Sequence, residues 1–72
     1  MNEKDKLKIL LDHWVEHNDH HCEEFTKWAK RARDLGMLEI SADIKHAVEQ
    51  MKAANRYLLG AVQRLCAGGR SS

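Results

Sequence analysis

Four histidines occur within nine residues, in the stretch HWVEHNDHH that runs from His13 to His21. On a helix, residues three or four positions apart lie on one face, so the spacing predicts a cluster of His17, His21 and Glu24. His13 and His20 are predicted to lie further toward solvent beside that cluster. Paired imidazoles with a carboxylate suit zinc, nickel, cobalt or iron as ligands. The stretch therefore predicts a candidate divalent-metal site.

The charges around these histidines favour cations. The segment from Asp12 to Glu24 contains five carboxylates and no lysine or arginine, whereas the whole chain has 12 basic and 11 acidic residues. A local acidic field of this kind attracts cations. The balanced total charge argues against a nucleic acid or an anionic membrane as the partner.

A structural role for the same region is an equally concrete alternative. Asn18 and Asn55 each interrupt an apolar heptad pattern, and they fall at the same height if the two helices are antiparallel. A buried asparagine commonly fixes register and oligomeric state at some cost in stability. His17 and His21 would extend this polar layer. The two interpretations are a metal-binding module and a purely structural or protein-interaction bundle, and the sequence leaves both open.

Catalysis has less support in the sequence. The histidines at His13 and His17 are four apart, but the glutamate between them does not fit the HExxH pattern of zinc proteases. Cys22 follows His21 directly and is expected on a neighbouring face, which makes it a poor fourth ligand. No serine or cysteine has a base and an orienting group at readable spacing. We therefore expect a non-enzymatic protein.

The apolar residues predict two long helices separated by Gly36. The first helix is expected over residues 3–35, with Asn2 and Asp5 forming a capping box. The second is expected to follow Gly36 and to run to the end of the apolar pattern. The residues predicted to form the contact seams are Leu7, Leu11, Trp14, Asn18, His21, Phe25, Trp28, Ala32 and Leu35 in the first helix and Ile44, Val48, Met51, Asn55, Leu58, Val62 and Leu65 in the second. Leu10, Val15, Cys22 and Ala29 widen the seam of the first helix. Within this pattern Trp14 and Trp28 are predicted core anchors.

A short turn makes these helices antiparallel neighbours, so the predicted fold is an all-α two-helix hairpin. We expect one domain over residues 1–67 and a flexible tail over residues 68–72. Each apolar stripe is wider than one helix contact, and residues such as Leu10, Val15, Leu38, Ile40 and Leu59 would stay wet in a monomer. A homodimer in which two hairpins pair into a four-helix bundle would cover them. Any other protein partner is unknown.

The segment HWVEHNDHHCEEFTKWAKRARDLG, with the alanine-rich stretch that holds Ala54 and Asn55, resembles a small uncharacterised family of prokaryotic helical hairpins. This resemblance extends from Leu7 to Leu65. It implies a helical fold and an unassigned function, and it implies no catalytic residues for this chain.

The first residues, MNEKDKLK, lack the apolar region of a signal peptide, and two cysteines do not make a secreted disulfide pattern. The expected location is therefore the reducing cytoplasm, with no membrane span.

Overall fold

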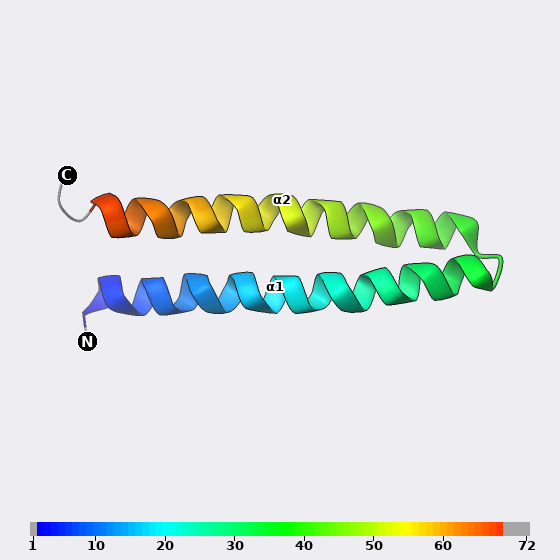
Figure 1. The fold of residues 1–72 in the computed structure, drawn as a ribbon, viewed down its shortest axis with the longest axis horizontal. Coiled ribbons are helices and arrows are strands. Elements are labelled where there is room, and N and C mark those ends of the chain that lie inside the picture. The colour runs from blue at the N-terminus through cyan, green and yellow to red at the C-terminus, as the bar shows by residue number, and fades with distance from the viewer. Residues whose placement is uncertain (1, 69–72) are drawn as a thin grey trace.

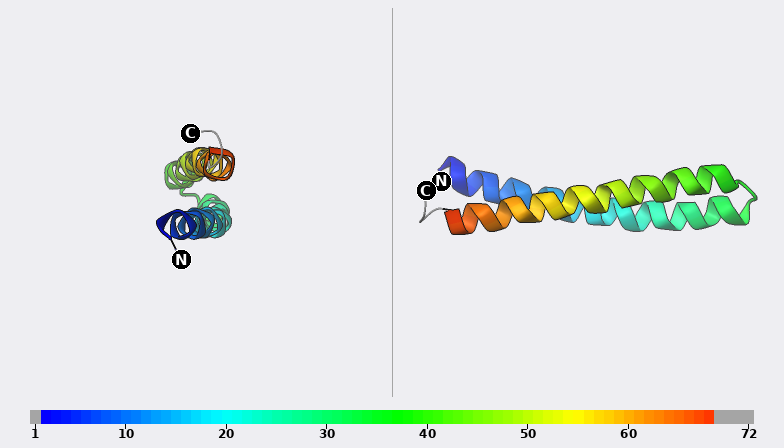
Figure 2. Two further views of the ribbon diagram at one scale, coloured as in Figure 1. Left: turned by 90° about the vertical axis from the view of Figure 1, so that its left-hand side faces the viewer. Right: turned by 90° about the horizontal axis from the view of Figure 1, so that it is seen from above.

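The computed structural model describes residues 2–68 and shows two long helices lying side by side (Figure 1). Helix α1 spans Glu3–Asp34 and helix α2 spans Leu38–Gly68. They are antiparallel, so the start of α1 and the end of α2 lie at the same end of the hairpin, and the helices cross at a shallow angle (Figure 2). The all-α hairpin is therefore confirmed. The predicted tail begins at Gly68, which is the last residue of α2, and residues 69–72 lie outside the described part.

Local sequence signals fix the start of α1. Asn2 has extended backbone dihedrals, and its side-chain oxygen accepts a hydrogen bond from the backbone N–H of Asp5 at 2.8 Å. This bond satisfies one of the amide groups that have no partner in the first turn of a helix. The predicted N-cap is confirmed.

The end of α1 is closed by a Schellman motif centred on Gly36. The N–H of Met37 donates to the carbonyl of Ala32 at 2.8 Å, and the N–H of Gly36 donates to the carbonyl of Arg33 at 2.9 Å. Gly36 has φ +83°, which is the left-handed conformation that this motif requires. The chain reverses within three residues, from Leu35 to Met37, and this short reversal makes the helices antiparallel neighbours.

The seam that α1 presents to α2 differs from the predicted one. The buried and half-buried residues of α1 are Leu11, Val15, Asn18, His21, Cys22, Glu24, Ala29 and Ala32. Trp14 remains 42% exposed and Trp28 59% exposed, so the prediction that both are core anchors is wrong for the single hairpin. Cys22 is buried between the helices, on a different face of α1 from the histidine pair, which agrees with the expectation that it is not a ligand beside His21. The seam predicted for α2 is correct, since all seven of its residues are buried or half-buried.

Small side chains bring the helices close together near the turn. Ala29 and Ala32 of α1 are buried there, and Ser41 of α2 is buried against them. The Ser41 hydroxyl donates to the backbone carbonyl of Ala29 at 2.7 Å. A larger residue at any of these positions would push the helices apart, because packed interiors tolerate little added volume.

No helix within residues 2–68 is both long enough and apolar enough to cross a membrane. Both helices carry charged residues along their length. The long apolar residues that remain exposed therefore need another explanation.

The two glycines of the hairpin should respond oppositely to alanine. We expect Gly36→Ala to lower the free energy of unfolding by about 1–2 kcal/mol, because a β-carbon is strained at positive φ. Gly60 lies inside α2, and a β-carbon there would meet nothing within 4 Å. Gly60→Ala should therefore raise the free energy of unfolding by about 0.5–1 kcal/mol. Urea denaturation followed by circular dichroism measures both, and a stabilising Gly36→Ala would contradict the role assigned to the turn.

Candidate functional site

The closest pair of histidines is His17 and His21, one turn apart near the middle of α1. Their Nε2 atoms lie 3.2 Å apart, and their ring centroids are 4.4 Å apart. His17 is exposed and His21 is half-buried. The two rings are inclined at 66°, and the Nε2 of one lies within hydrogen-bonding distance of the Nε2 of the other.

This separation suits two ligands of one metal ion. With metal–nitrogen bonds of about 2.0–2.1 Å, neighbouring ligand nitrogens lie about 2.9 Å apart in octahedral geometry and about 3.3 Å apart in tetrahedral geometry. The observed 3.2 Å falls between these values. The pair can therefore chelate a transition-metal ion once the hydrogen bond between the rings is given up and both Nε2 lone pairs turn toward the ion.

The other predicted ligands are not brought into this pair. The His13 ring stacks on the His17 ring with 5.8 Å between centroids, and the His20 ring is tilted 6.2 Å from that of His21. Glu24 is half-buried one turn further along α1. Within residues 2–68, no three His, Cys, Asp or Glu side chains are arranged to hold a metal ion. The predicted cluster of His17, His21 and Glu24 is thus reduced to a pair of imidazoles.

On the neighbouring face of α1, Asn18 and Asn55 form a polar layer between the helices. The Asn18 amide donates to the side-chain oxygen of Asn55 at 2.9 Å. The Asn55 amide in turn donates to the backbone carbonyl of Val15 at 3.3 Å and to the carboxylate of Asp19 at 2.8 Å. Asn55 is only 5% exposed, so these bonds replace water that its amide group has lost. Every polar side-chain atom that is buried in residues 2–68 has a partner.

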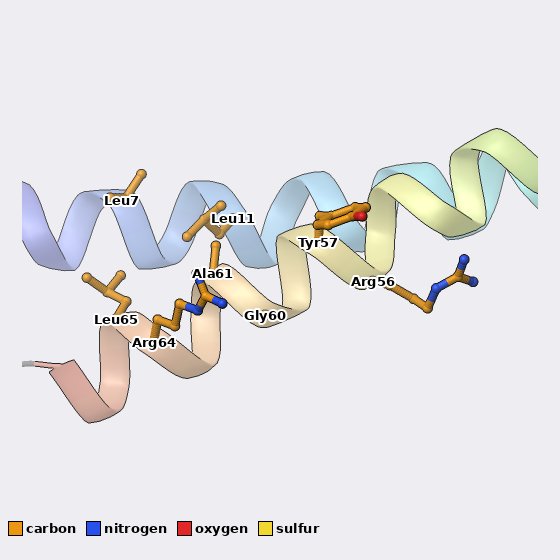
Figure 3. Close-up of a pocket in the computed structure, with 8 residues that line it drawn as sticks. All are labelled: Leu7, Leu11, Arg56, Tyr57, Gly60, Ala61, Arg64 and Leu65. Carbon is orange, nitrogen blue, oxygen red and sulfur yellow. The ribbon is translucent and has the colours of Figure 1, made fainter.

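A second apolar surface, which we call the apolar face, lies beside the contact between the helices. It consists of Leu7, Leu10, Trp14, Phe25 and Trp28 from α1 and Ile40, Ile44, Ala47, Ala54, Ala61 and Leu65 from α2. Near the turn, Phe25 and Trp28 line one apolar depression together with Ile44 and Ala47. At the open end, Leu7 and Leu65 border a groove that Figure 3 shows between the two helices.

The histidine pair lies in the middle of the apolar face. On α1 the residues Leu10, Trp14, His17 and His21 follow at spacings of three and four, so they share one side of the helix. The His21 ring approaches the Phe25 ring, with 5.8 Å between centroids. The candidate site is therefore set in an apolar surface rather than in an open polar one.

Over residues 7–65 the sequence matches DUF8180, which is described as a domain of unknown function. The chain belongs to the DUF8180 family. No curated protein and no solved structure matches it. The match covers most of the chain and agrees with the expected small uncharacterised family, and it assigns no residue a role.

Acidic residues in this DUF8180 chain have few basic partners near the histidines. Asp12, at the start of the acidic segment, accepts a hydrogen bond from Lys8 at 3.1 Å. That bond and the charge of Asp12 raise the pKa of the Lys8 ammonium above its ordinary value. Glu16, Glu23 and the remaining carboxylates up to Glu24 make no ion pair with a described lysine or arginine. The segment keeps the negative field that the sequence predicts.

Cys22 is buried in the helix contact of the DUF8180 chain. Its sulfur lies 3.9 Å from the backbone carbonyl of Val48, and the Thr26 hydroxyl donates to the carbonyl of Cys22 at 2.7 Å. The sequence already places it at the edge of the predicted seam, because Val15, Cys22 and Ala29 repeat every seven residues. The thiol is therefore a packing group of the helix contact and is not available to the histidine pair.

The hydrogen-bonded asparagines should be energetically coupled. Asn18→Leu removes the donor of the buried Asn55 oxygen, so we expect it to lower the free energy of unfolding by about 1–3 kcal/mol. In the double variant with Asn55→Leu, that buried oxygen is gone and much of the loss should be recovered. A double-mutant cycle by urea denaturation should give a coupling energy of about 0.5–3 kcal/mol. Strictly additive changes would show that the two side chains do not interact.

Proposed function

We propose that this protein is a non-enzymatic homodimeric helical module that binds a divalent transition metal through His17 and His21. The observation that carries the proposal is the 3.2 Å distance between their Nε2 atoms, which matches the spacing of two ligands on one ion. Zinc, nickel, cobalt and iron all accept imidazole in such geometry. The surrounding carboxylates add a field that concentrates cations.

Dimerisation is supported by what the single hairpin leaves exposed. Its buried apolar core contains Leu11, Cys22, Ala29, Ala32 and Val48, of which two are alanines. Chains of this length rarely gain enough stability from such a core alone. Covering the apolar face with a second hairpin would bury Trp14 and Trp28, which carry the largest apolar areas in the chain.

The second candidate function is a structural or protein-interaction bundle without metal. It is favoured by the complete hydrogen bonding of Asn55, which ties the height of α2 to that of α1. In this case His17 and His21 would only extend the polar layer. Metal binding by the purified chain separates the two candidates.

A thermal-shift measurement tests metal binding. With protein purified without an affinity tag, one equivalent of Zn²⁺ or Ni²⁺ should raise the melting temperature, because a ligand that binds only the folded state stabilises it. His17→Ala or His21→Ala should abolish the increase. His13→Ala combined with His20→Ala, and His46→Ala on α2, should retain it. If the His13 and His20 changes remove the shift while His17→Ala leaves it intact, the assigned pair is wrong.

Light scattering at micromolar concentration tests the dimer. The wild-type protein should have the mass of two chains, and Trp28→Glu should have the mass of one, because it places a charge in the covered surface. Leu59→Glu is the matched control. Leu59 was expected among the residues that a second hairpin covers, but it lies two residues from Ala61 and so faces away from the apolar face, and it is also about half exposed. A wild-type monomer that unfolds cooperatively would contradict this part of the proposal.

A further inference from the structure

The histidine pair supplies only part of a metal coordination shell. A structural zinc site has four protein ligands, whereas α1 offers two imidazoles at chelating distance. No third ligand from residues 2–68 joins them, and Cys22 is buried between the helices. Ligands that complete the shell must therefore come from outside the single hairpin.

The position of the pair along α1 indicates where these ligands lie. The middle of α1, Glu3–Asp34, falls between Asn18 and Asp19, and the middle of the His17–His21 pair is Asp19, half a residue away. When two copies of a helix pair in parallel and in register, each residue lies beside the same residue of the other copy. When they pair antiparallel about their centres, a residue before the middle of one copy lies beside the residue that is equally far after the middle of the other. In both arrangements His17 and His21 of one copy are level with those of the other.

The large apolar residues on both sides of the pair fit the same arrangement. Leu10 and Trp28 lie nine residues before and after the middle of the pair, and each belongs to the apolar face. An antiparallel second copy would thus place its Trp28 against Leu10, and its Leu10 against Trp28. The histidines would then be enclosed between two apolar contacts, which exclude water from the metal.

Space for the imidazoles is available beside them on α2. Asn55 contacts Val15, Asn18 and Asp19, so this part of α2 is level with the histidine pair. Its neighbour Ala54 belongs to the apolar face and is exposed. Because the side chain of Ala54 is only a methyl group, it leaves space beside the histidine pair that a larger side chain would fill.

We infer that one metal ion is shared by two copies of this chain, bound by His17 and His21 of both at the centre of the dimer. This inference rests on the proposed function and adds the source of the missing ligands. The apolar face then has one occupant, a second copy, because only a second copy brings another histidine pair to the same height. Metal binding and dimerisation must also strengthen each other, since each completes the site of the other.

Isothermal titration with Zn²⁺ and sedimentation velocity with and without Zn²⁺ test the shared site. We expect one ion for every two chains, and a dimer dissociation constant that falls at least tenfold when Zn²⁺ is present. With Co²⁺ in place of Zn²⁺, the visible absorption of a four-coordinate ion should develop at the same ratio. The double variant with His17→Ala and His21→Ala should still dimerise, but Zn²⁺ should not lower its dimer dissociation constant. The double variant with His13→Ala and His20→Ala should behave as the wild type.

Interface variants separate failure of this inference from failure of the proposed function. Trp28→Glu should weaken Zn²⁺ binding at least tenfold along with dimerisation, and Leu59→Glu should change neither. One ion per chain in the wild type, or a monomeric Trp28→Glu protein that keeps the wild-type Zn²⁺ affinity, would overturn the shared site and leave the proposed metal module standing. A wild-type protein that binds no Zn²⁺, Ni²⁺ or Co²⁺ would overturn both.

Discussion

A two-helix hairpin can bury only one stripe of each helix, and α1 carries two adjacent stripes. One stripe, from Leu11 to Ala32, packs on α2, and the other, from Leu7 to Trp28, remains on the surface. The two cannot be buried by α2 at once, because they point in directions that differ by nearly a quarter turn of the helix. Most features of the molecule follow from this division, including its small core, its exposed tryptophans and the setting of its histidines.

The same division explains what the sequence could and could not predict. The helix boundaries, the Asn2 cap, the turn at Gly36 and the seam of α2 follow from local signals, and the structure has them as expected. On α1 the sequence pattern merges both stripes, so the predicted seam lies between them and includes Trp14 and Trp28. Only the position of α2 decides which stripe is inside. Residues as small as Ala29 and Cys22 occupy the buried stripe because they let the two helices approach closely. A hydropathy pattern does not record this advantage of small size.

The candidate site shows a similar limit. Helical spacing is enough to put His17 and His21 on one side of α1, but it cannot tell whether a third group such as Glu24 reaches them. That depends on side-chain directions, and in the folded hairpin only the two imidazoles converge. The level placement of Asn18 and Asn55, by contrast, depends on the turn length alone, and a single hydrogen bond joins them.

The Schellman turn also determines which kind of four-helix assembly the chain can build. The sequence has no proline, and the helical pattern is strong on both sides of Gly36, so a chain without this turn could continue as one straight rod of roughly 100 Å. Two such rods could form every α1–α2 contact between chains instead of within one, which is a domain-swapped dimer. The three hydrogen bonds that close the turn between Arg31 and Met37 hold the chain in the folded-back form. They make each copy a separate unit that can join and leave its partner without unfolding.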